Sequence, residues 1–279
     1  MVAQPIDVHA EAAAQGLPED AVPGITARLR AAGCVFAEDE AKLIIGSAST
    51  PDELAAMIDR RVAGLPLEHV LGWAEFCGLR IIVGPGVFVP RRRSEFLVSQ
   101  AVAAVRSGSR SFRVPVVLDI CWGSGALGLA VATQLGMAEL HAADIDPGAC
   151  EYARRNLAAI AGHVHEGDLF DSLPADLHGR VDLIVANAPY VPTAEVGVMP
   201  AEARLHEPLV ALDGGSDGVN VHRRVAANAP EWLARGGSLL IETSERQAAL
   251  TEAAMARAGL TTTVVTDGDL DTTVVIGRR

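Results

Sequence analysis

Residues 114–125 read Val-Pro-Val-Val-Leu-Asp-Ile-Cys-Trp-Gly-Ser-Gly, and this stretch decides the fold. Its first half is apolar and rich in β-branched side chains, a pattern that predicts a buried parallel strand. The glycines predict a turn, and the apolar pattern that starts at Ala126 predicts a helix. Strand, glycine-containing turn and helix form the first unit of a nucleotide-binding α/β domain, where missing side chains let a ligand approach the backbone.

Acidic residues follow the next two predicted strands. Residues 139–143 form an apolar run that ends at Asp144, and an acid in this position suits the two hydroxyls of a ribose. A third, shorter strand at 163–165 leads to Asp168, which we expect near an adenine amino group. Together these residues predict one half of a nucleotide site at the carboxyl edge of a sheet.

A fourth apolar run, residues 181–186, is followed by Asn187-Ala188-Pro189-Tyr190. The Asn side chain and a neighbouring backbone carbonyl can hydrogen-bond a planar N–H group, while Tyr190 stacks on its face. The alternative is an ordinary exit from a strand, because Asn, Pro and Tyr are common in turns. The tetrapeptide is therefore a candidate clamp for a planar nitrogen group.

Taken in order, these motifs resemble the class I S-adenosylmethionine-dependent methyltransferases, and among them the HemK/PrmC group of protein glutamine methyltransferases. Residues 90–95, Pro-Arg-Arg-Arg-Ser-Glu, are similar to that group's Pro-Arg-x-x-Thr-Glu segment. Glu207-Pro208, Ala211-Leu212 and residues 214–218 are similar to its downstream Glu-Pro, Ala-Leu and Gly-Gly-x-Asp-Gly block. The resemblance runs from about Leu67 to the end of the chain.

The resemblance implies an α/β fold, with a class I methyltransferase Rossmann-like sheet preceded by a small helical domain and a β-hairpin linker. The implied domains are a helical substrate-recognition domain (1–66), the linker (67–95) and a methyltransferase domain (96–279). The implied cofactor is S-adenosyl-L-methionine. The residues expected to bind it are Arg91, Glu95, Asp119, Cys121, Gly123, Gly125, Asp144, Ile145, Asp168, Leu169 and Asn187. The residues expected at the catalytic clamp are Asn187, Ala188, Pro189 and Tyr190.

Two residues depart from the group's pattern. Cys121 stands where the glycine-rich loop has its first Gly, and Ala188 replaces the first Pro of Asn-Pro-Pro-Tyr. We expect Cys121 to be tolerated if its φ stays negative, and the Ala188 carbonyl to serve as well as that of Pro.

The leading hypothesis is an N-methyltransferase that acts on a glutamine side-chain amide of a protein. The altered clamp leaves open a free amino acid, a guanidine or another small molecule as acceptor. Two further alternatives are methylation of a nucleic-acid base and a catalytically silent cofactor-binding interaction protein. The formal net charge of −12 disfavours a surface that neutralises phosphates.

Composition restricts the setting of the protein. A chain of 279 residues with 49% hydrophobic residues is long enough for a sizeable core and lacks a run of membrane-spanning length or a signal-peptide pattern. Its four cysteines show no Cys-x-x-Cys spacing and indicate reduced thiols in the cytoplasm rather than disulfides or zinc. His163 and His165 alternate in a strand, and we expect exposed or hydrogen-bonded histidines and no metal site.

Six side chains carry expectations of their own. Arg91 is expected beside the cofactor, and Arg92 and Arg93 in solvent. Asp182 is expected to be structural. Glu207 could orient the acceptor or form a loop salt bridge, and Trp122 could pack in the core or form a wall of the site.

The remaining elements are predicted from periodicity and capping. Residues 1–18 are expected to be a frayed lead-in, and Thr50 is expected to cap a helix that begins at Pro51. Residues 67–89 are expected to form paired strands, and residues 190–218 are expected to form a polar loop. Helices are expected at 21–32, 38–48, 51–63, 94–106, 219–234 and 245–258, and strands at 238–242, 261–265 and 272–276.

Overall fold

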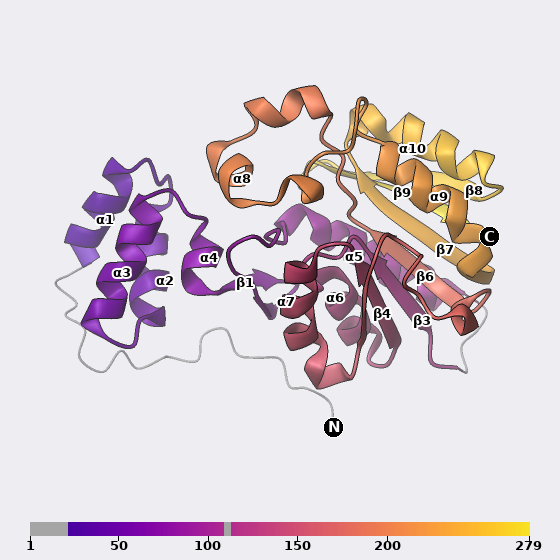
Figure 1. Ribbon diagram of the computed structural model, residues 1–279, viewed down its shortest axis with the longest axis horizontal. Helices are drawn as coiled ribbons and strands as arrows, with labels where there is room; N and C mark the ends of the chain where they lie inside the picture. The colour runs from indigo at the N-terminus through magenta and orange to yellow at the C-terminus, as the bar shows by residue number, and fades with distance from the viewer. Residues whose placement is uncertain (1–21, 109–112) are drawn as a thin grey trace.

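The computed structural model describes residues 22–108 and 113–279 (Figure 1). A group of short helices forms one end of the molecule, and a helix-covered sheet forms the other. The expected lead-in at residues 1–18 lies outside the described residues.

Three helices, α1 (Val22–Ala31), α2 (Ala37–Ser47) and α3 (Pro51–Val62), pack around a small apolar core of their own. Leu29, Ile44 and Met57 are buried in it, one from each helix. The predicted cap of α3 is confirmed, because the Glu53 amide donates to Thr50 Oγ1 at 3.1 Å and Pro51 occupies the first turn.

The segment between the helices and the sheet is only partly the pair of strands expected at residues 67–89. Leu67–Leu71 forms a short helix, α4, which ends at Gly72 in the left-handed conformation. The strands β1 (Trp73–Phe76) and β2 (Leu79–Ile82) follow as an antiparallel hairpin. The helix was missed because His69 is buried against Val87, a tertiary contact in which its Nε2 lies 2.9 Å from the Val87 carbonyl oxygen.

The second part is one seven-stranded sheet in the order β5-β4-β3-β6-β7-β9-β8. The first five strands in that order are parallel, and β9 runs antiparallel to both of its neighbours. The strands are β3 (Val116–Ile120), β4 (Glu139–Asp144), β5 (His163–Glu166), β6 (Val181–Ala186), β7 (Leu233–Thr243), β8 (Thr261–Asp267) and β9 (Thr272–Arg278). The order reverses direction between β3 and β6, so a crevice opens at their carboxyl ends.

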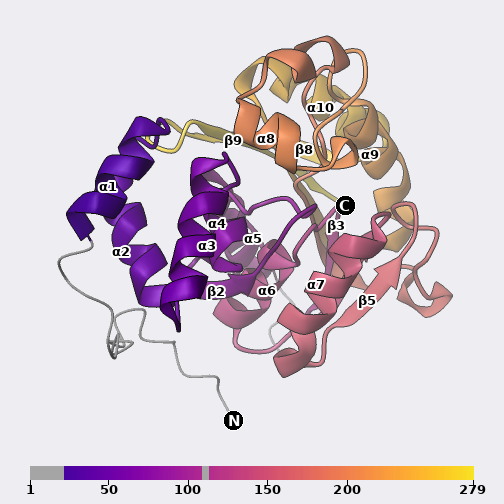
Figure 2. The same cartoon turned by 60° about the vertical axis from the view of Figure 1, so that its left-hand side comes forward.

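Helices cover both faces of the sheet (Figures 1 and 2). On one face α5 (Glu95–Ser107), α6 (Ala126–Leu135) and α7 (Pro147–Leu157) share a core with Val117 and Leu183. On the other face α9 (Asn220–Trp232) and α10 (Glu245–Arg257) pack against Ile184 and Ile241. Both clusters hold apolar residues of β3 and β6, because parallel strands are buried on both faces.

Two sequence predictions need correction in the second half of the chain. The polar loop expected at 190–218 contains α8 (Ala201–His206) and the short 3-10 turns Thr193–Val198 and Leu209–Ala211. The helix expected to reach Ala234 ends at Trp232, and β7 begins at Leu233, because Leu233 pairs with Val181 before the ladder shifts register.

Other 3-10 turns lie at Arg92–Ser94, Ala158–Ile160 and Ala175–Leu177. Within the described ranges, no helix is both long and apolar enough to span a bilayer.

Candidate active site

A cavity of 240 Å³ lies where β3, β4 and β6 end. It reaches from the glycine-containing turn after β3 to the segment after β6. The structure brings most of the predicted site residues to its wall, namely Arg91, Cys121, Gly123, Asp144, Ile145, Asp168, Leu169, Asn187, Ala188, Pro189 and Tyr190.

The turn after β3 and the end of β4 are tied together by one carboxylate. Asp144 Oδ2 accepts a hydrogen bond from the Gly123 amide at 3.0 Å, and Oδ1 accepts one from the Asp146 amide at 2.9 Å. Burial raises the pKa of Asp144, and these backbone contacts oppose that effect. The carboxylate is therefore held in one orientation at the cavity wall.

Three predicted cofactor-binding residues, Asp119, Gly125 and Glu95, lie behind this wall and not on it. Asp119 is fully buried and its Oδ2 accepts from the Gly128 amide at 2.7 Å, while burial raises its pKa to about 8. Gly125 has φ +80 and begins α6, and Glu95 accepts from the Cys77 amide at 3.1 Å. The two carboxylates accept hydrogen bonds from main-chain amides, and Gly125 provides the left-handed residue before α6. These three residues therefore act on the backbone near the cavity.

The condition set for tolerance of Cys121, a negative φ, is not met, because its φ is +59. This is the left-handed region, where a side chain costs energy and glycine does not. The Cys121 amide donates to the Ala143 carbonyl of β4 at 3.0 Å, so the residue is still bonded to the sheet. The chain leaves β3 at the same residue, and the positive φ accommodates this change of direction. Burial raises the pKa of the Cys121 thiol well above its usual range, so the side chain stays a neutral thiol.

We expect Cys121→Val to lower the free energy of unfolding by about 1–3 kcal/mol, because a β-branched residue is strained at positive φ. Urea denaturation measures the effect. Cys121→Gly is the matched variant, since it removes the strain, and it should be the more stable of the two. A valine variant as stable as the glycine variant would show that the turn does not hold this conformation in solution.

The far end of the cavity contains an ion pair that the sequence did not suggest. Arg224 on α9 donates to Asp168 Oδ2 at 2.7 Å, and both residues line the cavity. Trp122 lies beneath the turn, is buried in the core and also lines the cavity, so both of its expected roles apply.

A second ion pair joins the segment before α5 to the loop after α8. Arg91 contacts Glu207 through a short hydrogen bond, and the Val89 amide donates to the same Glu207 oxygen at 3.4 Å. Burial raises the pKa of Glu207, while Arg91 opposes that effect. Glu207 thus forms the salt bridge that was one of its two expected roles, at the wall of the cavity.

The segment after β6 forms the other part of the wall. Asn187 Nδ2 donates to Ser94 Oγ at 3.2 Å, and Arg93 donates to the Tyr190 hydroxyl. Burial raises the pKa of Tyr190 to about 12, so this phenol stays protonated. Burial lowers the pKa of His222 to about 4, although its contact with the Ala188 carbonyl acts in the opposite direction.

Sequence reasoning missed Ser94, Arg93, Arg224 and Glu242 as site residues. Ser94 and Arg93 stood inside the quoted segment 90–95. Arg93 is exposed, as expected, and it also contacts Tyr190 and Glu242. An acid inside the apolar run Leu239–Glu242 was the available signal for Glu242, since a charge at the end of a buried strand is unusual. No local pattern pointed to Arg224.

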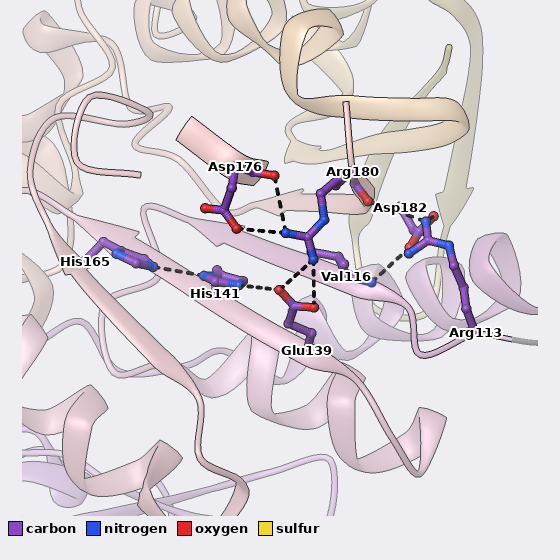
Figure 3. Close-up of polar contacts among 8 residues, drawn as sticks. All are labelled: Arg113, Val116, Glu139, His141, His165, Asp176, Arg180 and Asp182. Carbon is purple, nitrogen blue, oxygen red and sulfur yellow. Dashed lines mark hydrogen bonds and ion pairs between the residues drawn. The ribbon is translucent and has the colours of Figure 1, made fainter. Parts of the chain in front are cut away.

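Figure 3 shows a polar network along neighbouring strands of the sheet, and none of its residues lines the cavity. His165 Nε2 lies 3.0 Å from His141 Nδ1, and His141 Nε2 lies 3.1 Å from Glu139 Oε1. Asp182 accepts from the Val116 amide at 2.9 Å and pairs with Arg113, which agrees with its expected structural role. Burial lowers the pKa of His165 to about 4. Within residues 22–108 and 113–279 no group of three candidate metal ligands occurs.

Comparison with known proteins identifies the type of domain. The family model described as "Methyltransferase small domain" matches residues 79–215. A release factor glutamine methyltransferase of Mycolicibacterium smegmatis is 38% identical over 255 residues, which cover 90% of this chain and 88% of that protein. One from Geobacter sulfurreducens is 41% identical over 203 residues, covering 71% and 68% respectively. A solved methyltransferase from Pyrococcus furiosus has a TM-score of 0.51 at 17% identity, covering 72% of this chain and 89% of that one.

The sheet order, the glycine-containing turn and the acid at the end of β4 define an S-adenosylmethionine-dependent methyltransferase of class I. Within that class, the chain belongs to the family of release factor glutamine methyltransferases, the HemK/PrmC group.

The cavity fits this cofactor. Gly123 has φ +56, and a side chain added there would project to within 3.7 Å of Phe88, a residue of the cavity wall. The carboxylates of Asp144 and Asp168 stand at the ends of successive strands, where hydroxyl and amino groups of a nucleoside find acceptors. Apolar side chains of Leu127, Ile145 and Leu169 line the space between.

Proposed function

We propose that this enzyme methylates the side-chain amide nitrogen of a glutamine in a protein release factor. Membership of the family supports this acceptor, since the curated relatives bear that name. The observation that carries the proposal is the orientation of the Asn187 amide at the cavity wall.

Asn187 has one side of its amide already engaged. Its Nδ2 donates to Ser94, and no described residue donates to Oδ1. Oδ1 is therefore available to accept an N–H of a planar acceptor, and the carbonyl of Ala188 stands next to it in the chain. Asn187 Oδ1 and the Ala188 carbonyl are uncharged hydrogen-bond acceptors. They suit an amide substrate, because an amide is itself uncharged and needs no carboxylate to balance it.

S-adenosylmethionine supplies an electrophilic methyl group when it is bound. The task of the chain is to hold the acceptor nitrogen in line with that group, and positioning of this kind supplies a large part of a barrier reduction. Hydrogen bonds from the amide N–H groups to Asn187 Oδ1 and the Ala188 carbonyl would favour positive charge on nitrogen as its bond forms. The Tyr190 ring would fix the plane of the amide from one side.

No strong base is needed for this reaction. The amide nitrogen becomes acidic once it is alkylated, so its proton can pass to water afterwards. Tyr190 is a protonated phenol at neutral pH and Cys121 is a neutral thiol, so neither serves as a base or a nucleophile. The clamp thus acts by orientation and by neutral hydrogen bonds.

The experiment is transfer to a purified bacterial release factor. The full chain, S-adenosylmethionine and the factor are incubated, and tandem mass spectrometry locates the added methyl group. We expect one glutamine to be methylated. Incubation with a host lysate separated by size provides the contrast, because label in small molecules or nucleic acid, with none in the factor, would contradict the proposal.

We propose that the helical part, residues 22–62, contributes to binding the acceptor protein. It is joined to α8, since Arg61 donates to Glu202 at 3.0 Å, and Arg61 also pairs with Glu40 within the helical part. Val35 and Phe36 at the turn between α1 and α2 are 81% and 70% exposed. Large apolar side chains exposed together often mark a protein contact.

Phe36→Ser should lower kcat/KM for the release factor by about tenfold, the effect of losing roughly 1.4 kcal/mol of apolar contact. Turnover of a short glutamine-containing peptide should not change, because a short peptide occupies the cavity alone. Met137→Ser is the matched control, since Met137 is exposed between α6 and β4, away from the cavity. Equal losses on factor and peptide would refute the recognition role.

We propose the cytoplasm as the site of action, where a release factor is made available by translation. All four cysteines are free thiols in the structure, a state that agrees with a reducing compartment.

A further inference from the structure

A second cavity of 360 Å³, the rear cavity, opens beside the clamp and has no role in the proposed chemistry. It lies where β7 ends, at the turn that joins β8 to β9. Arg93 and Tyr190 line the rear cavity as well as the cavity of the candidate site, so the two cavities are neighbours.

Three buried polar side chains of the rear cavity have no hydrogen-bond partner among the described residues. They are Glu242 and Thr243 at the end of β7 and Thr272 at the start of β9, with exposed fractions of 1%, 3% and 5%. Glu242 pairs in the ladder with Val274, two residues after Thr272, so Glu242 and Thr272 belong to the same face of the sheet. Burying a polar group without a hydrogen bond is costly, so three such groups around one cavity favour a ligand that completes their bonds.

The charge of the wall favours a cation. Four carboxyl groups and the Arg93 guanidinium line the rear cavity. Arg93 Nε lies 3.5 Å from Glu242 Oε1, so this guanidinium balances one acid. The other three, which bring the formal charge of the lining to −3, are Glu245, Asp267 and Asp271.

The Glu242 carboxyl group responds to charge in its surroundings. Burial raises its pKa, and the nearby Arg93 opposes that effect. A second cation at this carboxyl group would act in the same direction as Arg93 and favour the ionised form.

The arrangement of the acids suits an organic cation better than a metal ion. Within residues 22–108 and 113–279, no three acidic, histidine or cysteine side chains are grouped so that they could hold one metal ion. The hydroxyls of Thr243 and Thr272 can accept N–H groups alongside the Glu242 carboxylate. A guanidinium or an alkylammonium carries several N–H donors on one charge and therefore matches this set.

We propose that the rear cavity binds a guanidinium or alkylammonium group, held by the Glu242 carboxylate and by the hydroxyls of Thr243 and Thr272. The cation is either a basic side chain close to the glutamine in the acceptor protein or a small free amine, since both present the same group. Tyr190 forms part of both walls, so one acceptor chain could fill both cavities. The site rests on the contacts of the rear cavity alone, and its use by an acceptor protein rests on the proposed function.

The direct test is titration of the full chain with methylguanidinium, without acceptor and at constant ionic strength. The methyl NMR resonances of Thr243 and Thr272 are assigned by their loss in the two valine variants. We expect both to shift saturably at millimolar probe. N-methylurea is the matched probe, because it has nearly the same shape and no charge, and it should bind about tenfold more weakly. Equal affinity for the two probes, or no saturable shift with either, overturns the proposal.

Glu242→Gln tests the charge, because it keeps the size of the side chain and its capacity for hydrogen bonds. We expect the affinity for methylguanidinium to fall by about tenfold in Glu242→Gln and by about fivefold in Thr272→Val, which loses one neutral hydrogen bond. Glu40→Gln is the matched control, since Glu40 is a buried acid of α2 that pairs with Arg61 and does not line the rear cavity. If Glu242→Gln keeps the parent affinity, or Glu40→Gln loses as much, the assignment fails. The comparison with N-methylurea needs no substitution and stays decisive if a variant fails to fold.

Peptide acceptors distinguish the two sources of the cation. Glutamine peptides with one arginine at successive positions are compared with peptides that carry citrulline, the neutral isostere of arginine, at the same positions. If the acceptor supplies the cation, one arginine position should lower KM by about tenfold relative to citrulline, and Glu242→Gln should remove the difference. If no position matters while methylguanidinium binds, the rear cavity takes a free amine. Absence of transfer to any glutamine, with charge-dependent binding of methylguanidinium, would refute the proposed acceptor and leave the cation site in place.

Discussion

Asn187→Ala is expected to lower kcat on a glutamine acceptor by about 10²–10³-fold, the usual cost of one preorganised hydrogen bond at a reacting group. The side chain lies at the end of β6, and its hydrogen bond among the described residues is the one to Ser94. Little packing depends on it, so the free energy of unfolding and the affinity for S-adenosylmethionine should stay close to those of the parent. Single-turnover kinetics and calorimetry measure the two quantities separately.

Asn187→Asp is the control that reports on the acceptor. It keeps the shape and one acceptor oxygen but removes the donor to Ser94 and adds a charge. The new carboxylate would instead accept the hydroxyl hydrogen of Ser94. An amide acceptor should therefore suffer from Asp as well, whereas a cationic guanidinium or amine would gain an attractive partner. Near-parent rates in both variants would discard the amide clamp, and an active Asp variant would favour a small-molecule acceptor.

Asp144→Ala should weaken the binding of S-adenosylmethionine by about 10–100-fold. Hydrogen bonds to a charged group contribute about 1.5–3 kcal/mol, and each 1.4 kcal/mol is a factor of ten. The structure adds a second reason, because Asp144 also holds the amides of Gly123 and Asp146 and so braces the turn that faces the cofactor. Isothermal titration calorimetry gives the dissociation constant.

Asp176→Ala is the matched control for Asp144→Ala. Asp176 is an exposed acid whose carboxylate pairs with Arg180 at 2.9 Å, in the network of Figure 3 and outside the cavity. Its loss should leave the dissociation constant unchanged. If Asp144→Ala binds as tightly as this control, the assignment of the ribose-binding acid is wrong.

Most of the elements that position the site could be predicted from the sequence, because each has a strong local pattern. The apolar run before Cys121 and the glycines after it predicted β3 and the start of α6, and Thr50 with Pro51 predicted the first turn of α3. The order of the acids along the chain placed Asp144 and Asp168 at the ends of β4 and β5. These patterns are informative because burial imposes a period of two or 3.6 residues on the sequence itself.

The errors have a common physical origin in contacts between distant residues. Residues 67–71 are helical where the buried His69 contacts the Val87 carbonyl, and β7 starts early because Leu233 pairs with Val181. Cys121 has a positive φ because the turn has to leave β3 after its amide has bonded to Ala143. None of these constraints is visible in a local window, because each depends on where another segment lies.

The sequence by itself determined the class of fold and the cofactor and predicted the four residues of the clamp, since each of these is encoded in a continuous stretch. Only the tertiary structure decided which atoms of the clamp are free. Ser94 and Asn187 are 93 residues apart, and they meet because α5 packs against the sheet where β6 ends. The direction of a hydrogen bond depends on the full set of neighbours around one hydroxyl group, and folding alone brings those neighbours together.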